Sequence, residues 1–405
     1  MASPKLSKRG QLAPASPIRR LTPFADAAKA RGVKVHHLNI GQPDIETPRA
    51  MIEAYQRYDE AVLAYAPSDG YREYRDKLAV YYTAVAAEGD GEPVGPQDIV
   101  VTTGGSEALL FGIAATCDVG DSIVVCEPYY TNYAGISHLL GVEVEAVTCH
   151  ASEGFRIDPA RVEAAIGAKT RALVLPTPGN PTGVVLDRDE LAALADICRR
   201  HDLFFLCDEV YREFVYDQAE GSRAPSVLGL QGFADRAVVI DSVSKRYSAC
   251  GARIGALVTR NPELREAALR FGQARLSPPT VDQYAAMAGL DTPPEYFAEV
   301  VRRYQRRRRV LVAGLHELGI DCITPKGAFY LVAPLPVEDA DDFSRYLLED
   351  FALDGETVMV APASGFYASE GLGKNEVRIA YVLGEERLKR SLAILGAALE
   401  AYAKR

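Results

Sequence analysis

The chain has 405 residues, of which 48% are hydrophobic and 25% are charged, and its formal net charge is -10. This length and composition predict an ordinary globular protein with more than one lobe, each large enough to bury a core. The acidic balance argues against nucleic acid or an anionic membrane as a partner. No run reaches the roughly 18 uninterrupted apolar residues of a membrane-spanning helix, so we also expect no membrane insertion.

The first sixteen residues are polar and basic without an apolar centre, which does not resemble a secretory signal. We expect a mobile N-terminal arm over residues 1–16. The seven cysteines are odd in number and irregularly spaced, which is typical of thiols in a reducing compartment, and we predict a cytoplasmic protein. The six histidines are dispersed, and we predict no metal site.

Short apolar runs alternate with amphipathic segments from about residue 97 to residue 260. Such alternation is typical of right-handed crossovers that build a mostly parallel sheet with helices on both faces. The expected strands are residues 99–101, 122–126, 142–147, 172–175, 203–207, 237–240 and 256–258. The expected helices between them are residues 106–116, 133–140, 162–166 and 190–200.

The C-terminal part of the chain predicts a second, smaller lobe of mixed composition. Its expected helices are residues 294–318, 342–351 and 385–403, and its expected strands are residues 327–333, 358–361 and 377–382. This part is small for an independent lobe, so we expect N-terminal residues, including a short helix at 24–31, to complete it.

The predicted fold is therefore α/β. A large domain with a mostly parallel sheet sandwiched by helices is joined by a smaller α+β domain built from both chain ends. The expected boundaries are an arm at residues 1–16, small-domain residues 17–50, a large domain at residues 51–290 and a C-terminal small domain at residues 291–405.

One lysine lies just past the expected strand at residues 237–240. Ser242 and Ser244 precede Lys245, and Arg253 follows it eight residues later. Burial favours the neutral amine of a lysine, which is the nucleophile in Schiff-base chemistry, and the two hydroxyls and the arginine are donors for a phosphate. Pyridoxal phosphate needs both groups together. Taken alone, this stretch could instead be an ordinary loop with a solvated lysine and no bound cofactor.

Two other strand ends carry candidate binding groups. Gly104, Gly105 and Ser106 open an expected helix, where glycines allow close backbone approach and the helix start favours an anion. A plain helix cap is the alternative for these three residues. Tyr130 follows the next strand and could stack on a flat ring, although packing between helices is the commoner use of tyrosine.

Two more strands end in polar groups. Three prolines and two glycines in residues 176–183 predict a rigid loop that presents Asn180. Asp208 directly follows an apolar strand, and Tyr211 lies three residues further on. A carboxylate in such a place needs a cation or donors, and a protonated pyridine nitrogen is one suitable cation.

Taken together and in this order, the motifs resemble the class I/II aminotransferases, which are aspartate aminotransferase-like enzymes of pyridoxal-phosphate fold type I. The resemblance spans about residues 17–403. Its most specific motifs are Asn180-Pro181-Thr182-Gly183, Asp208-Glu209-Val210-Tyr211, Ser242-Val243-Ser244-Lys245 and Gly251-Ala252-Arg253-Ile254-Gly255. Also consistent with it are Gly41-Gln42-Pro43-Asp44, Tyr65, Gly327-Ala328-Phe329-Tyr330 and Val377-Arg378-Ile379.

The resemblance implies a pyridoxal-phosphate-dependent transaminase of amino acid metabolism and biosynthesis that moves an amino group from an L-amino acid to a 2-oxo acid. Lys245 would form the aldimine with the cofactor and then shuttle a proton. Asp208 would pair with the pyridine nitrogen. Tyr211 and Asn180 would hydrogen-bond the ring oxygen, and Tyr130 would stack on the ring.

The resemblance also implies how the two anionic ends of the ligands are held. The phosphate would be bound by Gly104, Gly105, Ser106, Ser242, Ser244 and Arg253. Tyr65 would reach the same phosphate from a second subunit, which implies a homodimer with shared active sites. Arg378 would grip the substrate α-carboxylate as a fork, helped by the Gly41 backbone and by Asn180.

The motifs leave the substrate open. Family members specific for aspartate often have a basic residue where this chain has Ser106, which puts dicarboxylic specificity in doubt unless Arg19, Arg20 or another mobile side chain serves instead. A β-eliminating lyase or a synthase on the same scaffold is the alternative enzyme. A cofactor-binding regulator is a further alternative, but the arm is too short to form a DNA-binding domain.

Overall fold

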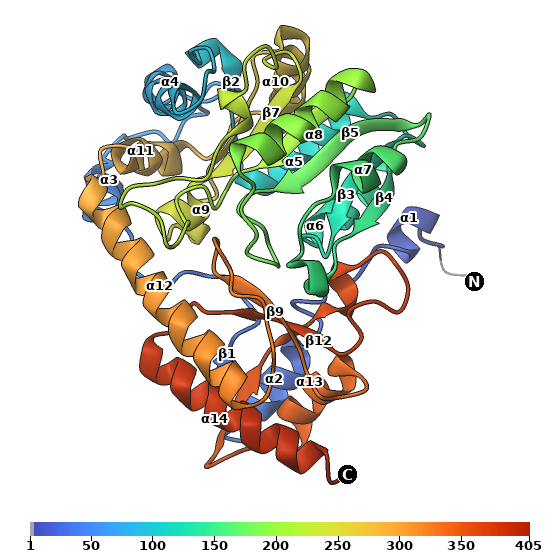
Figure 1. Cartoon of the computed structure of the whole chain (residues 1–405). Helices are drawn as coiled ribbons and strands as arrows, with labels where there is room; N and C mark the ends of the chain where they lie inside the picture. Colours follow the sequence, from blue (N-terminus) through green and yellow to red (C-terminus); the bar gives the residue numbers. More distant parts are fainter. Residues whose placement is uncertain (1–3) are drawn as a thin grey trace.

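The computed structural model describes residues 4–405 and shows two lobes joined along one side by the long helix α12 (Pro294–Glu317) (Figure 1). Within these residues the larger lobe contains a seven-stranded sheet. Strand β8 runs antiparallel to both of its neighbours, and the other pairings are parallel, so the expected mostly parallel sheet is confirmed. The strand order is β2 (Ile99–Thr102), β8 (Gly255–Val258), β7 (Ala237–Ser242), β6 (Phe204–Asp208), β5 (Thr170–Pro176), β3 (Ser122–Glu127) and β4 (Glu143–Thr148).

Helices cover both faces of this sheet because its strands are apolar at successive positions. In β2, for example, Ile99 and Val101 belong to the core on one face and Val100 to the core on the other. The first core also contains residues of α3 (Arg49–Arg57), α4 (Arg72–Ala87), α7 (Pro159–Ala164), α8 (Arg188–Arg200), α9 (Val243–Arg246) and α11 (Thr280–Gly289). The second contains residues of α5 (Gly105–Thr116), α6 (Asn132–Leu140) and α10 (Pro262–Arg275).

The smaller lobe combines residues from both ends of the chain, as expected. Strand β1 (Lys34–His37) pairs in parallel with β10 (Glu356–Met359), more than 300 residues later. A second sheet has the order β11 (Ala361–Pro362), β12 (Glu376–Ala380) and β9 (Tyr330–Pro334), with antiparallel pairing. The accompanying helices are α2 (Thr22–Ala30), α13 (Ala340–Glu349) and α14 (Glu385–Tyr402). The lobe has its own apolar core, to which β9, β10, β12 and α14 contribute.

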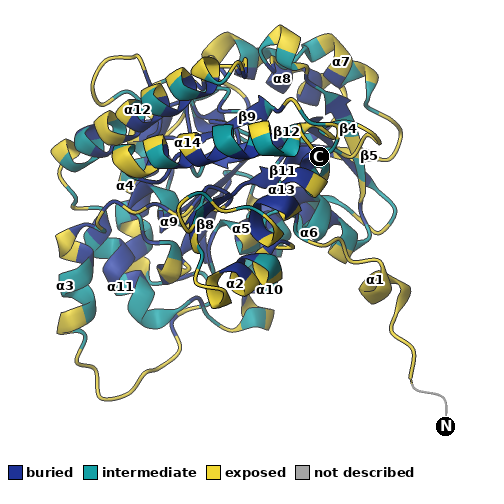
Figure 2. Cartoon of the chain, turned by 90° about the horizontal axis from the view of Figure 1, so that it is seen from below, coloured by how far each residue is buried: buried dark blue, intermediate teal, exposed yellow. Residues whose placement is uncertain are grey.

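The N-terminal segment contains the four-residue helix α1 (Lys8–Gln11), all of whose residues are exposed, and α1 projects from the edge of the molecule (Figure 2). The Arg9 carbonyl oxygen and His138 Nε2 of the larger lobe lie 2.9 Å apart, which is hydrogen-bond distance. Residues 1–3 of the expected arm lie outside the described residues. The mobility of the arm and the domain boundaries after residues 16, 50 and 290 stay predictions. Among residues 4–405, no helix is both long enough and apolar enough to cross a membrane.

Candidate active site

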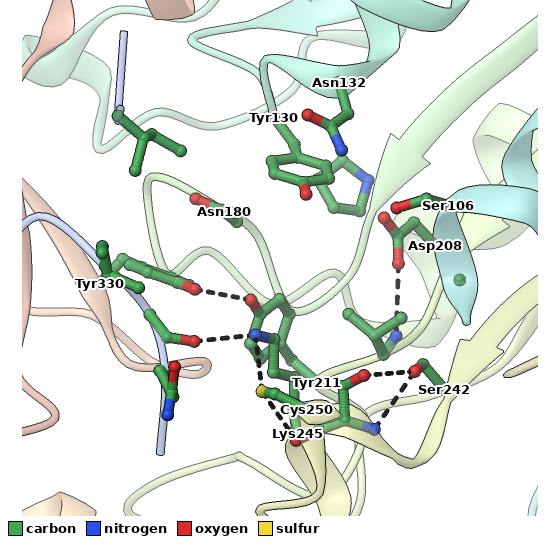
Figure 3. Close-up of a pocket in the computed structure, with 18 of the residues that line it drawn as sticks. Ser106, Tyr130, Asn132, Asn180, Asp208, Tyr211, Ser242, Lys245, Cys250 and Tyr330 are labelled. Atoms are coloured by element: carbon green, nitrogen blue, oxygen red, sulfur yellow. Dashed lines mark hydrogen bonds between the residues drawn. The ribbon is translucent and has the colours of Figure 1, made fainter. Parts of the chain in front are cut away.

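A cavity of about 700 Å³ lies where the carboxyl ends of the parallel strands face the smaller lobe (Figure 3). Its walls on the larger lobe include Pro176 at the end of β5, Asp208 at the end of β6 and Ser242 at the end of β7. Its walls on the smaller lobe include Tyr330 on β9 and Arg378 on β12. Polar groups distant in the sequence meet here because parallel strands bring their carboxyl ends to one edge of the sheet.

Lys245 lies on α9, a single turn that begins directly after β7. The Ser242 hydroxyl caps this turn by accepting a hydrogen bond from the Ser244 amide. The Lys245 Nζ donates to the Gly41 carbonyl oxygen at 2.8 Å and lies 3.6 Å from Cys250 Sγ. The amine is therefore held at the cavity wall by groups without charge.

Asp208 is the last residue of β6, and its carboxylate is buried. It accepts a hydrogen bond from the Tyr133 hydroxyl at 3.0 Å and a longer one from the Val210 amide at 3.4 Å. No Lys, Arg or His within residues 4–405 forms an ion pair with it, and burial raises the pKa of Asp208 to about 6. A cation placed at this carboxylate would restore its ordinary ionised form.

Arg378 is almost fully buried on β12, with 1% of its surface exposed. Its Nη1 donates to the Asn180 side-chain oxygen at 3.1 Å, and its Nη2 donates to the Asn39 carbonyl oxygen. The guanidinium lies between two aromatic rings, with its central carbon 4.5 Å from the centroid of Tyr330 and 5.0 Å from that of Phe366. Burial lowers the pKa of Arg378.

The Arg378 guanidinium is also short of partners. Its Nε has no hydrogen-bond partner among residues 4–405, and no carboxylate of these residues pairs with the group. A buried cation without a counter-ion is unfavourable, and the arrangement is complete only when an anion enters the cavity. The planar fork of an arginine suits a carboxylate in particular.

The opposite end of the cavity has the features of a phosphate cradle. Gly104 takes a φ of 76° before the first turn of α5, and a Cβ at this position would lie 2.4 Å from Arg253 Nη2. Only glycine leaves room for this arginine at the helix start, where backbone amides favour an anion. The Ser242 and Ser244 hydroxyl oxygens lie 2.8 Å apart beside it, and Ser106 is exposed to the cavity.

Three tyrosines line the middle of the cavity. The hydroxyls of Tyr211 and Tyr330 share a hydrogen bond of 2.7 Å, and both side chains face the Lys245 amine (Figure 3). The rings of Tyr130 and Tyr133 pack edge to face, with their centroids 5.7 Å apart. Burial raises the pKa of Tyr130 to about 12, so its phenol stays neutral near pH 7. A Cβ on Gly41 would lie only 1.7 Å from the Tyr330 hydroxyl, so a side chain at position 41 would displace that tyrosine.

The cavity gathers most of the residues that the sequence predicted for a binding site. Those that line it are Gly41, Gly105, Ser106, Tyr130, Asn180, Asp208, Tyr211, Ser242, Ser244, Lys245, Arg253 and Arg378. Gly104 does not line the cavity itself but lies next to the Arg253 guanidinium, which does. Tyr65 does not line the cavity of its own chain and is 78% exposed.

The sequence did not assign roles to several lining residues. Tyr330 belongs to a motif of the resemblance, but its contact with Tyr211 depends on how the two lobes meet. Cys250 comes close to Lys245 because the chain turns back at Ser248, which has a φ of 51°. Ser16 and Ile18 reach the cavity from the N-terminal segment, and no periodic pattern marks that placement.

The donor set fits pyridoxal phosphate. The cradle at Arg253 and the start of α5 suits its phosphate, and Asp208 is a buried carboxylate that lacks a cation. The Lys245 amine at the cavity wall suits its aldehyde carbon, and Arg378 remains for the carboxylate of a second ligand. A cavity of this volume also lies in the range that binds small cofactors and their substrates.

Comparisons with known proteins agree with this chemistry. The family model for aminotransferase class I and II matches residues 33–395. An aspartate aminotransferase of Bacillus subtilis is 30% identical over 96% of this chain and 97% of its own length. An aromatic-amino-acid aminotransferase of Thermococcus litoralis is 31% identical over 96% of each chain.

Solved structures show the same similarity. A structure of Thermus thermophilus aspartate aminotransferase with maleate is 30% identical, with a TM-score of 0.87 over 98% of this chain and all of the other. An aspartate aminotransferase of Thermotoga maritima is 28% identical, with a TM-score of 0.88 over the same shares of the two chains. The predicted family, fold class, cofactor and enzyme class are confirmed: the chain belongs to the class I and II aminotransferases and is a pyridoxal-phosphate-dependent transaminase.

Proposed function

We propose that the cavity between the lobes is the active site of this transaminase, with Lys245, Asp208 and Arg378 as the residues that carry the reaction. The observation that supports this best is the buried Arg378 guanidinium, which has an unpartnered Nε and faces the same cavity as the Lys245 amine. In such a pair, the arginine would bind the α-carboxylate of an amino acid and the lysine amine would reach its α-carbon.

The residues that would hold the cofactor divide into three groups. Gly104, Gly105, Ser106, Ser242, Ser244 and Arg253 would hold its phosphate. Asn180 and Tyr211 would hydrogen-bond its ring oxygen, and Tyr130 would stack on the ring. Asp208 would keep the ring nitrogen protonated, and burial raises the pKa of Asp208 itself to about 6. When bound, pyridoxal phosphate supplies an electron sink for the negative charge left on the substrate α-carbon.

Lys245 would both anchor the cofactor and move the proton. Its Nζ lies at the cavity wall, where it would take the proton from the substrate α-carbon. The Gly41 carbonyl oxygen, at 2.8 Å from Nζ, orients this amine. In the reverse half-reaction, Lys245 would return a proton to the α-carbon of the 2-oxo acid substrate.

Arg378 would select which bond reacts. Two parallel hydrogen bonds from its guanidinium fix the α-carboxylate in one plane, and Asn180 and the Tyr330 ring hold the guanidinium in turn. With the carboxylate fixed, one α-carbon bond faces the Lys245 amine, and proton removal is favoured over loss of carbon dioxide.

We further propose a cytoplasmic homodimer that acts in amino acid metabolism and biosynthesis. The strongly exposed Tyr65 supports the dimer, because a large exposed tyrosine suits an interface and the family resemblance places it at a second subunit's phosphate site. Seven free thiols support a reducing compartment. Size-exclusion chromatography with light scattering tests the dimer, and a fully active monomer would contradict it.

The first test is Lys245→Ala. We expect loss of the visible absorbance of the lysine-bound cofactor and a fall in turnover by at least about a thousandfold, because both the anchor and the proton carrier are gone. Absorbance spectra and single-turnover kinetics with an amino donor measure the two effects. Lys77→Ala removes a partly exposed lysine that pairs with Asp291, and it should change neither the absorbance nor the turnover. A Lys245→Ala protein that transaminates at the parent rate would refute the assignment.

The second test is Arg378→Gln. We expect weaker binding of every amino acid and 2-oxo acid substrate by about 2–5 kcal/mol, because each shares the α-carboxylate that this arginine would bind. Steady-state kinetics with a panel of amino donors and 2-oxo acids measure it. Arg306→Gln changes an exposed arginine of α12 and serves as the matched control. Unchanged saturation for all substrates would exclude Arg378 as the carboxylate site.

A further inference from the structure

The cavity contains one more cation than the proposed function uses. Among the described lining residues, the charged side chains are one carboxylate, Asp208, and four cations, Lys245, Arg253, Arg378 and Arg19. The cofactor aldehyde, the phosphate and the substrate α-carboxylate account for the first three cations. Arg19 remains, and its charge faces the same space.

The backbone that carries Arg19 is held in place. The Arg19 and Arg20 amides both donate to the Ser16 carbonyl oxygen, at 3.1 and 2.9 Å, which closes a turn. The Asn39 side chain donates to the Ile18 carbonyl oxygen at 2.9 Å, and Ile18 packs against a small apolar cluster of the smaller lobe. Arg19 therefore extends from a fixed turn and not from the exposed arm before it.

The same turn lies next to the Arg378 site. The Asn39 residue that holds the Ile18 carbonyl also accepts a hydrogen bond from Arg378 through its own carbonyl oxygen. Phe366, which belongs to the apolar cluster under Ile18, stacks on the Arg378 guanidinium at 5.0 Å. Both arginines also act electrostatically on the Tyr130 phenol. An anion held by Arg378 therefore lies in the same cavity that Arg19 lines.

The neighbouring arginine differs sharply. Arg20 forms an ion pair with Asp341, and its Nη2 lies 3.4 Å from the Ser364 hydroxyl oxygen. The Arg20 guanidinium therefore already has a counter-ion within the smaller lobe. Arg19 is exposed, and its guanidinium has no hydrogen bond or ion pair with any residue of 4–405. Ser16, Gln42 and Asn132, which also line the cavity, have neutral side chains.

We infer that Arg19 binds the distal carboxylate of a dicarboxylic substrate, so that the enzyme prefers a dicarboxylic amino acid and a dicarboxylic 2-oxo acid. This inference rests on the proposed function, in which Arg378 takes the α-carboxylate. Two guanidiniums that line one cavity then bind the two ends of one substrate. A neutral serine at position 106 is compatible with this specificity, because the second cation comes from the N-terminal turn instead.

The test compares isosteric substrates in the holoenzyme. The parent enzyme should favour glutamate over glutamine, and aspartate over asparagine, in kcat/KM. Arg19→Met should lower kcat/KM for the dicarboxylic partner by about ten- to a hundredfold, which is the loss of one charge-assisted hydrogen bond, and leave the amide partner nearly unchanged. Arg19→Lys keeps the charge and should restore part of the preference. Arg20→Met is the control and should leave the ratio unchanged.

A binding measurement separates recognition from turnover. Butanedioate, a non-reacting dicarboxylate, should shift the spectrum of the parent holoenzyme and bind about ten- to a hundredfold more weakly to Arg19→Met. A parent enzyme that transaminates neutral amino acids equally well, or an Arg19→Met protein with unchanged ratios and butanedioate affinity, would overturn the inference and leave the proposed function standing. Faster reaction of a phosphonate analogue than of aspartate would overturn the choice of carboxylate. Loss of all substrates in Arg378→Gln tests the proposed function separately.

Discussion

Two aspartates at the ends of neighbouring strands differ in what surrounds them. Asp208 ends β6 and faces the cavity, and Asp241 lies near the end of β7 and faces the interior behind Lys245. Both carboxylates are buried. Burial raises the pKa of Asp208 to about 6. Burial acts the same way on Asp241, but Arg246 and Arg212 outweigh it and hold the pKa of Asp241 below its ordinary value.

The interior site is a closed network of opposite charges. Arg246 donates to Asp241 at 2.6 Å and to Glu213 at 2.8 Å. Arg212 donates to Glu209 at 2.8 Å, and the Tyr82 hydroxyl donates to Asp241 at 2.8 Å. This cluster lies directly beneath the turn that carries Lys245. It fixes that turn, because moving Arg246 would leave the buried Glu213 carboxylate without an ion pair and the Asp241 carboxylate with only the 3.5 Å contact to Arg212.

The cavity site has the reverse arrangement. Asp208 lacks a cation, Arg378 lacks a carboxylate, and Lys245 is held by neutral groups. Lys245 and Arg246 are adjacent in the sequence, yet Arg246 faces the network and Lys245 faces the cavity. The comparison indicates how structural charges differ from functional charges in this fold. Buried charges that have counter-ions within the protein stabilise the scaffold. Buried charges that lack such counter-ions mark the place where a charged ligand binds.

The largest expected effect comes from breaking the interior network. Arg246→Met should lower the free energy of unfolding by about 3–5 kcal/mol, because Asp241 and Glu213 lose their shared cation. Urea unfolding of the cofactor-free protein at pH 7 measures the change.

The neighbouring substitution is the control for that measurement. Lys245→Met removes a cation that has no counter-ion, so the unfolding free energy should stay within about 0.5 kcal/mol of the parent value. Equal losses in Arg246→Met and Lys245→Met would show that the two sides of α9 do not differ as proposed.

The sequence predicted the sheet well because its strands are short, apolar and bounded by turns. The expected strand 122–126 is β3 (Ser122–Glu127), and the expected helix 294–318 is α12 (Pro294–Glu317). No helix was predicted over α4 (Arg72–Ala87). Its buried face uses Tyr74 and Tyr82, whose hydroxyls made the face look polar, and the Tyr82 hydroxyl in fact bonds to Asp241.

The site was predictable to the extent that it follows strand ends. Asn180, Asp208 and Lys245 each lie at or just after the carboxyl end of a parallel strand, so their convergence comes from the topology. The contact of Tyr211 with Tyr330 and the position of Arg19 depend on how the smaller lobe closes on the larger one. No local pattern encodes that docking. The role of Tyr65 stays a prediction, since it requires a second subunit.

The smaller expected effect sharpens the comparison at Asp208. Its pKa in the folded, cofactor-free protein is about 6, above the ordinary 3.8, so ionising it costs folding free energy. Below about pH 4, Asp208 is protonated in both the folded and the unfolded protein and does not change the free energy of unfolding. As the pH rises towards 6, the free energy of unfolding falls, and at higher pH the loss stays constant at about 3 kcal/mol. The amide introduced by Asp208→Asn cannot ionise. The unfolding free energy of Asp208→Asn relative to the parent should therefore rise by about 3 kcal/mol between pH 4 and pH 7.

Asp241→Asn supplies the opposite sign. The folded-state pKa of Asp241 is lowered, so its carboxylate stabilises the fold above about pH 4 and loses this contribution as the pH falls. Asp241→Asn should therefore be less stable than the parent at pH 7, and the deficit should shrink at low pH. Denaturant unfolding of the cofactor-free parent and both variants from about pH 2 to pH 7 gives the two curves. Bound pyridoxal phosphate should remove the advantage of Asp208→Asn, because the parent carboxylate then has its cation. If the stability difference from the parent changed with pH in the same way for both variants, the surroundings of Asp208 and Asp241 would not shift the two carboxyl pKa values in opposite directions, and the comparison would be wrong.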